Sequence, residues 1–212
     1  MLKQVEAEKS QISIIIPTYN ESENIINILH SIREIIPRNF SSQTIVVDDN
    51  SPDGTGKLVE DYLKNVKKIA DNTIEIIHRK AKNGLGSAIL KGIQQSKGDT
   101  IVVMDCDFSH PPQIIPKLIE SIKKYQYDIA VASRYIQGGK IQGWSLKRKL
   151  MSKFATLIAK KGLGINTKDP MSGFFAFKRS IIKELNFDAI GYKILLEILV
   201  KTKGVNIKEI AY

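Results

Sequence analysis

The chain has 212 residues, enough for one sizeable α/β domain whose core needs no disulfide or structural metal. A single cysteine excludes an intramolecular disulfide, and no Cys/His cluster has zinc spacing, which fits a reducing cytoplasmic compartment. The net charge is +10, no signal peptide opens the sequence, and no apolar run approaches the roughly 18 residues of a membrane helix, so we expect a soluble domain.

From Ile12 onward, short apolar runs alternate with amphipathic stretches, the pattern of a parallel sheet covered by helices. The runs predict strands at Ile12–Ile16, Thr44–Val47, Thr73–Ile77, Thr100–Met104 and Asp128–Ala132. Because their Ile and Val content is nearly continuous, we expect these strands to be buried on both faces. The intervening stretches predict helices at Ser22–Ile36, Thr55–Lys67, Gly84–Ser96 and Pro112–Tyr125.

After residue 132 the alternation breaks and a basic segment begins. Between Lys140 and Lys168 there are eight Lys or Arg residues and no Asp or Glu. Such a segment attracts the phosphates of a membrane surface or a nucleic acid, unless it is simply a solvated, lysine-rich face. Two further helices are predicted, Leu146–Lys161 and Lys193–Thr202, and no repeat or linker marks a second domain.

Polar side chains follow three of the predicted strands at the point where each strand ends. The segments are 17–21, 48–54 and 105–110, and each contains at least one carboxylate. In open α/β sheets, ligands bind outside the carboxyl ends of the strands. Three acidic strand ends exceed what turn chemistry requires, so the sequence predicts a ligand site at this edge.

Asp105 and Asp107 are the leading candidates for a metal site. Carboxylates separated by one residue can present oxygens to Mg²⁺ or Mn²⁺, a cation that also takes oxygens from a diphosphate. The alternative is that an aspartate merely begins the turn. The acidic ends of the other two strands favour the metal interpretation.

The other strand ends have the chemistry to hold a nucleoside. Asp48 and Asp49 can accept hydrogen bonds from a base or a ribose, or they can begin an Asp-Asn-Ser-Pro-Asp-Gly turn. Tyr19 can stack on a base. The segment around Tyr19 and Glu21 has a simpler interpretation too, in which Asn20 or Ser22 merely caps the helix that follows.

Two glycine-rich segments imitate other nucleotide sites. Segment 54–57 lacks the glycine at 51 and the Ser or Thr at 58 that a phosphate loop requires. Segment 84–86 does not follow the first strand, and position 89 is Ile rather than the third glycine of a dinucleotide fingerprint. Neither a P-loop ATPase nor a nicotinamide dehydrogenase is supported.

A family resemblance rests on motifs that run in order from about Ile12 to Tyr212. They are I-I-I-P-T-Y-N-E (14–21), V-V-D-D-N-S-P-D-G-T (46–55), N-G-L-G-S-A (83–88), V-V-M-D-C-D-F-S-H-P-P (102–112), A-S-R-Y-I-Q-G-G (132–139) and D-P-M-S-G-F-F-A (169–176). In this combination the chain resembles the dolichyl-phosphate mannose synthases, a group of family-2 glycosyltransferases. The resemblance implies an α/β GT-A fold, a Rossmann-like, mostly parallel sheet flanked by helices.

The resemblance also implies roles for individual residues. Those matching positions that hold the guanosine part of the donor are Pro17, Tyr19, Glu21, Val47, Asp48 and Asp49. Those matching the D-A-D motif, whose carboxylates contact donor and metal, are Asp105, Cys106 and Asp107, with Ser109 as a further candidate metal ligand. Arg134 and Lys193 match basic residues near the diphosphate, and Arg148 lies in a segment associated with the acceptor phosphate.

The implied reaction is inverting transfer of mannose from GDP-mannose to dolichyl or another polyprenyl phosphate, with Mg²⁺ or Mn²⁺, for protein or lipid glycosylation. The resemblance also implies catalytic roles for Asp107, Arg134 and Arg148. It places the reaction at the cytoplasmic face of a membrane. UDP-glucose is the alternative donor, and a silent or regulatory nucleotide-binding subunit is the alternative of another class. The acidic strand ends speak against nucleic acid as a partner, which the basic charge alone would suggest.

Two departures from the family pattern bear on activity. Cys106 replaces the alanine of D-A-D, a change between small residues. After a strand matching 205–212, relatives continue with a loop that carries another phosphate-binding arginine. Either a C-terminal tail, with or without a membrane anchor, is missing here, or this protein lacks the family's last basic contact.

We expect one catalytic domain over 1–212, with a nucleotide-binding part at about 10–135 and an acceptor- or membrane-facing part at about 136–212. In the second part, apolar residues of 144–158 alternate with Lys and Arg. A helix with this pattern can lie at a lipid interface, with lysines at the headgroups, or it can pack its apolar face on the sheet.

Overall fold

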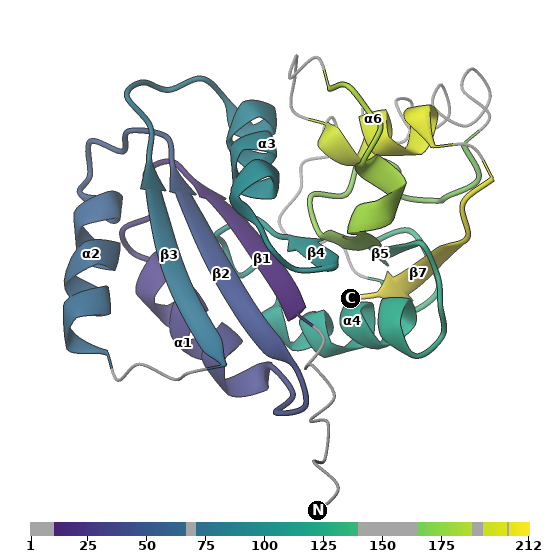
Figure 1. Ribbon diagram of the computed structural model, residues 1–212, viewed down its shortest axis with the longest axis horizontal. Coiled ribbons are helices and arrows are strands. Elements are labelled where there is room, and N and C mark those ends of the chain that lie inside the picture. Colours follow the sequence, from purple (N-terminus) through teal and green to yellow (C-terminus); the bar gives the residue numbers. More distant parts are fainter. Residues whose placement is uncertain (1–10, 67–70, 140–164, 188–192, 203) are drawn as a thin grey trace, which may run out of the picture.

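A seven-stranded mixed sheet forms the centre of the computed structural model, which describes residues 11–66, 71–139, 165–187, 193–202 and 204–212 (Figure 1). The strand order is β3-β2-β1-β4-β6-β5-β7. All pairs are parallel except those of β6, which runs antiparallel to β4 and β5. The strands are β1 (Gln11–Thr18), β2 (Ser41–Asp48), β3 (Asn72–His78), β4 (Thr100–Val103), β5 (Ile129–Ser133), β6 (Phe175–Lys178) and β7 (Ile207–Ala211).

The helices cover both faces of this sheet. They are α1 (Ile25–Ile35), α2 (Thr55–Asn65), α3 (Leu85–Gln95), α4 (Ile115–Lys123) and α6 (Ile194–Lys201), with short 3-10 helices η1 (Pro112–Ile114) and η2 (Arg179–Ile182). One buried cluster joins β1 to α1, α2 and α4, and a second joins the other face to α3 and α6. Gly92 lets α3 approach β1, because a Cβ there would lie 2.5 Å from a methyl carbon of Ile15. Among the described residues, no helix is long and apolar enough to cross a membrane.

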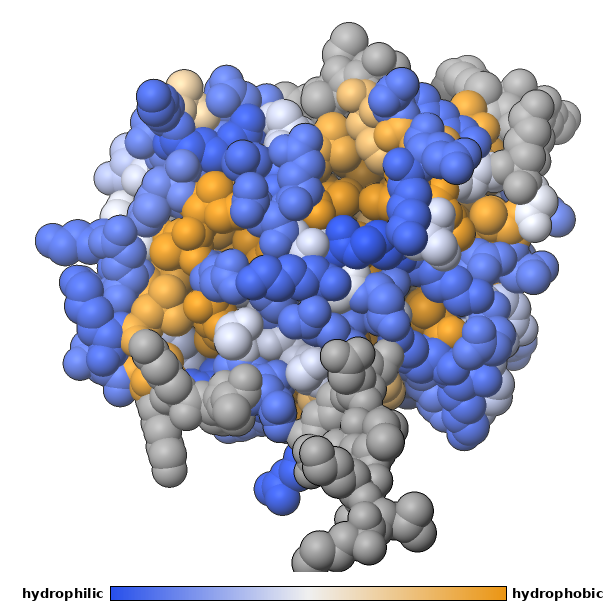
Figure 2. Space-filling view, viewed as in Figure 1, coloured by the Kyte–Doolittle hydropathy of each residue, from blue (hydrophilic) through white to orange (hydrophobic). Residues whose placement is uncertain are grey.

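The five strands predicted from apolar runs are all present, and four of them are fully or almost fully buried as expected. The expectation of burial on both faces is wrong for β3, whose residues alternate between half-buried and exposed. β3 lies at the edge of the sheet and pairs only with β2, so it has one neighbour fewer to cover it. The exposed residues of β3 are the polar Thr73, Glu75 and His78, and hydrophobic residues are visible beside them on the face where β2 and β3 lie (Figure 2).

The predicted helices are confirmed with shifted ends. The first begins three residues later, at Ile25, and the segment 112–125 divides into η1 and α4. The last prediction, 193–202, matches α6, whereas the predicted helix 146–161 lies outside the described residues.

The antiparallel strand β6 is the element that positions the site. It was not predicted as a strand, because it lies after residue 132, outside the alternation of apolar runs and amphipathic stretches on which the strand predictions rest. Val103 at the end of β4 pairs with Phe175 at the start of β6. The segment 169–174 before β6 is therefore brought beside Asp105, which follows β4.

Candidate active site

A pocket of about 320 Å³ lies where the carboxyl ends of β1, β2 and β4 meet. Parallel strands end at the same edge, so segments about 90 residues apart in sequence contribute to one wall. The lining residues are Pro17, Thr18, Tyr19, Glu21, Asp49, Lys82, Gly84, Leu85, Ala88, Asp105, Cys106 and Asp107. Seven of the predicted site residues are in this set; Val47 and Asp48 are buried beside it.

The acid pair Asp105 and Asp107 lies in this pocket within a tightly defined turn. Asp107 Oδ1 accepts hydrogen bonds from the Ser109 amide at 3.1 Å and the Ser109 hydroxyl at 2.5 Å. Gly173 lies against Asp105, because a Cβ there would be 2.8 Å from Asp105 Oδ2. The turn interpretation therefore holds for part of the segment, and Ser109 Oγ is committed to that turn.

Negative charge is concentrated around these carboxylates. Burial raises the pKa of Asp105, and the neighbouring Asp107 adds to the rise. Burial likewise raises the pKa of Glu21, with Asp107 and Asp105 contributing repulsion. Two oxygen-donor carboxylates under mutual repulsion fit a hard divalent cation. Among the described residues, no group of three or more His, Cys, Asp or Glu forms a metal site alone, so such a cation would need further oxygens from its ligand.

Asp48 and Asp49 have different neighbours. Asp48 accepts hydrogen bonds from the Thr18 hydroxyl at 3.0 Å and the Ser51 hydroxyl at 2.6 Å. These contacts favour the turn interpretation for Asp48. Asp49 lines the pocket, and its carboxylate accepts from the amide of Gly84 at 2.9 Å and from Arg79 Nη1 at 2.9 Å.

Asp49 thereby holds the loop 79–84, which sequence reasoning did not assign to the site. This loop carries Lys82, whose Nζ lies 3.5 Å from the centre of the Tyr19 ring. A cation over an aromatic face fixes the orientation of both groups. The motif N-G-L-G-S-A pointed to this region, but no sequence pattern paired Lys82 with Tyr19.

Two predicted basic residues lie next to the acid pair without lining the pocket. Arg134 donates to both carboxylate oxygens of Asp169 at 2.8 and 2.9 Å, and Asp169 is completely buried. Lys193 Nζ lies 3.5 Å from the Met171 carbonyl. The charges of Lys193 and Arg134 oppose the rise in the pKa of Asp105, so both are near it. Arg148 lies outside the described residues.

His110 joins the acidic turn to the segment before β6, a role that sequence reasoning missed. Its Nδ1 accepts the Asp105 amide at 3.0 Å, and its ring stacks on Phe174 at 5.3 Å between centres. Burial lowers the pKa of His110, which keeps the ring neutral and able to accept that bond. Cys106 is also buried here, and burial raises the pKa of its thiol.

The comparisons with known proteins match this fold and site. The model of glycosyl transferase family 2 matches residues 13–186, and the chain belongs to that family. A dolichol-phosphate mannosyltransferase from Pyrococcus furiosus is 39% identical over 95% of this chain and 56% of its own length. An undecaprenyl-phosphate mannosyltransferase from Micrococcus luteus is 35% identical over 84% of this chain and 71% of its own. The chain thus spans little more than half of the first of these relatives.

Solved structures confirm the GT-A type of fold expected from the sequence. Glucosyl-3-phosphoglycerate synthase from Mycobacterium tuberculosis, in complex with uridine diphosphate, superposes with a TM-score of 0.72 at 20% identity, over 95% of this chain and 70% of that chain. A mannosyltransferase from Pyrobaculum calidifontis, in complex with GDP-Man and Mn²⁺, superposes with a TM-score of 0.68 at 19% identity, over 94% of this chain and 54% of that chain.

Proposed function

We propose that this chain transfers mannose from GDP-mannose to dolichyl or another polyprenyl phosphate. The observation that carries the proposal is the acid pair Asp105 and Asp107 in a pocket at the carboxyl ends of the strands, with Arg134 and Lys193 nearby. The two relatives described above, from Pyrococcus furiosus and Micrococcus luteus, are a dolichol-phosphate and an undecaprenyl-phosphate mannosyltransferase. The glucosyl alternative is not favoured by these relatives.

The nucleoside part of the donor would occupy the wall made by β1, β2 and the loop 79–84. Tyr19 is 36% exposed, so one face of its ring can be offered to a base while Lys82 holds the other. Asp49 fixes the loop through two amides and Arg79, which keeps Lys82 in place. The pocket volume of about 320 Å³ accommodates part of a nucleotide sugar and leaves the rest at its open side.

The diphosphate would lie at the acid pair. Asp105 and Asp107 would hold a divalent cation, Mg²⁺ or Mn²⁺, which when bound neutralises charge on the leaving diphosphate. Lys193 adds a cation on the same side, and Arg134, fixed by Asp169, keeps its guanidinium in one orientation. Fixed charges of this kind stabilise a leaving group without rearranging during the reaction.

The chemistry is a single in-line displacement with inversion at the anomeric carbon. A bond forms from an acceptor phosphate oxygen to that carbon while the bond from the carbon to the nucleoside diphosphate breaks. A phosphate monoester has a second pKa of about 6, so the nucleophile is already ionised near neutral pH and needs no general base. The protein residues then act by position and charge, with Arg148 as the predicted contact of the acceptor phosphate.

The acceptor is a lipid, so the reaction belongs at a membrane surface. We place the reaction at the cytoplasmic face of the membrane, with the protein attached peripherally or anchored through a C-terminal region. The basic, apolar segment 140–168 is the candidate contact. Salt-sensitive binding to anionic vesicles tests this placement, and its absence would refute the interfacial role.

The decisive experiment is transfer of labelled mannose from GDP-mannose to dolichyl phosphate with Mg²⁺ or Mn²⁺, repeated with EDTA and with UDP-glucose. Mannolipid that forms only with metal supports donor, acceptor and metal together. Glucolipid alone would replace the donor by UDP-glucose. No product from either donor, in a chain extended to the length of its relatives, would favour the silent or regulatory subunit.

A further inference from the structure

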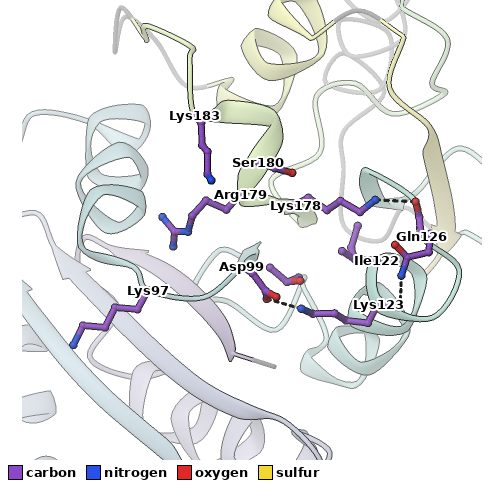
Figure 3. A pocket seen from close by; sticks show the side chains of 10 residues that line it. Lys97, Asp99, Ile122, Lys123, Gln126, Lys178, Arg179, Ser180 and Lys183 are labelled. Carbon is purple, nitrogen blue, oxygen red and sulfur yellow. Dashed lines mark hydrogen bonds and ion pairs between the residues drawn. The ribbon is translucent and has the colours of Figure 1, made fainter. Parts of the chain in front are cut away.

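A second pocket, of about 430 Å³, lies at the other end of the central strands, where β4 begins and β6 ends (Figure 3). It is lined by Lys97, Asp99, Thr100, Ile122, Lys123, Gln126, Lys178, Arg179, Ser180 and Lys183. Five of these side chains are cations and one is a carboxylate. None of these ten residues belongs to the basic segment 140–168.

The topology of the sheet explains why the cations meet. β6 runs antiparallel to β4, so Lys178 at its end pairs with Thr100 at the start of β4. The segment before β4 contributes Lys97, the end of α4 contributes Lys123, and η2 carries Arg179 into the same hollow. A concave wall of one charge sign raises the local concentration of ions of the opposite sign.

The pairings within the pocket leave its charge strongly positive. Asp99 forms an ion pair with Lys123 at 2.5 Å, and Lys178 pairs with Asp128 at 2.9 Å. Arg179 instead donates to two neutral acceptors, the Gly98 carbonyl at 2.6 Å and the Ser96 hydroxyl at 2.7 Å.

The guanidinium of Arg179 is therefore fixed in place by neutral oxygens. Burial lowers the pKa of Arg179, which shows that its charge is partly desolvated. Lys183 reaches toward Arg179, whereas Lys97 is directed away from the centre of the pocket (Figure 3).

The lining also limits what can bind. Among the described residues that line it, Ile122 is the only apolar one and is 1% exposed, and none is aromatic. The described lining accordingly offers no aromatic ring on which a nucleobase could stack. The chemistry that remains is a compact anion with more than one negative charge, which an arginine binds through paired hydrogen bonds.

We propose that this pocket is a binding site for a phosphate-class anion, separate from the donor pocket and independent of the proposed transfer reaction. Thr100 and Asp105 stand five residues apart along and just beyond β4, which corresponds to roughly 16 Å. The two pockets lie at opposite ends of β4, so an anion can occupy one while a donor occupies the other.

Pyrophosphate, titrated calorimetrically into the whole chain at low salt, is the first probe. Lys183→Glu should weaken binding about tenfold and Lys183→Gln about threefold, since each removes charge from beside Arg179. Lys64→Glu, an equal charge change on the exposed end of α2, should leave binding within a factor of two. Lys183 is exposed, so these variants should fold normally, as checked by thermal unfolding.

The same variants distinguish the source of the anion. Phosphatidylcholine vesicles with and without phosphatidic acid form a second arm. If only vesicle binding falls in Lys183→Glu, the pocket takes a lipid headgroup phosphate; if only pyrophosphate binding falls, it takes a free anion. The proposal is overturned if pyrophosphate and vesicles bind equally to wild type and Lys183→Glu, or if Lys82→Met, in the donor pocket, alone weakens pyrophosphate.

Discussion

The two ends of β4 carry opposite charge. At its carboxyl end Asp105, Asp107 and Glu21 crowd negative charge into a pocket with an aromatic ring, suited to a cation and a nucleotide together. At its amino end Lys178 and Arg179 belong to a positive pocket whose described lining contains no aromatic side chain. One strand thus separates two sites of different chemistry, and variants should affect one without the other.

The largest expected effect is that of Asp107→Asn on transfer. Removing a carboxylate from the acid pair should lower kcat/KM by at least about 100-fold, because the leaving diphosphate loses its stabilisation. Pyrophosphate binding in the basic pocket should remain. Measured mannolipid synthesis at full metal-dependent rate would contradict the metal assignment. Lys183→Glu is the reciprocal variant, with transfer kept and pyrophosphate binding weakened about tenfold.

A second variant tests the ion pair between Arg134 and Asp169, which lies next to the acid pair. Asp169→Asn leaves Arg134 without the buried carboxylate that it contacts through two bonds, and should lower the free energy of unfolding by about 3 kcal/mol. Denaturation in urea measures this loss. The double variant Asp169→Asn with Arg134→Met should recover part of the stability, because no unpaired charge remains, but none of the transfer activity. A double variant as unstable as the single one would show that the ion pair is not the cause.

Lys82 is expected to contribute to donor binding and not to the chemical step, in contrast to Asp107. Lys82→Met removes the cation from the face of Tyr19 and should raise KM for the donor about fivefold with little change in kcat. Lys80→Met, two residues away and also exposed, is the matched control. A fall in kcat with unchanged KM would instead place Lys82 at the reacting groups.

The smallest expected effect is that of Asp53, beside the start of α2, on the pH dependence of stability. Burial raises the pKa of Asp53, but hydrogen bonds from Thr55 and Ser22 outweigh it and lower the pKa from 3.8 to about 2. A lowered pKa stabilises the fold above the unfolded value, and that stability is lost as pH falls from about 4 toward 2. Asp53→Asn should therefore destabilise the chain at pH 7 by on the order of 1 kcal/mol. The difference from wild type should shrink at pH 3 in denaturant titrations, and a constant difference would exclude the charge as its origin.

The sequence predicted the first half of the molecule well because its information is local. Apolar runs of β1 and β2 are buried whatever they pack against, and polar residues after parallel strands meet at one edge by topology alone. The exposure of β3 depended on its place at the sheet edge, which no local pattern records. The strand β6 was missed because it lies after residue 132, where the alternation of strands and helices has ended.

The site shows the same division. Asp105, Asp107, Tyr19 and Glu21 were found because they follow strands, and their convergence needed only the order of the sheet. Lys82 and Asp169 were not, since each acts through a partner 63 or 35 residues away in the sequence. The basic pocket was missed for a related reason, because its cations come from three segments that are unremarkable in a lysine-rich chain.

The antiparallel course of β6 has a consequence for how the chain can vary. Its first residue fixes the segment that carries Gly173 against Asp105, and its last places Lys178 in the basic pocket. Inserting or deleting one residue within these four would turn every following side chain to the other face of the sheet. The length of β6 is therefore a constraint shared by both sites, and insertions in this region should be tolerated only beyond the ends of the strand.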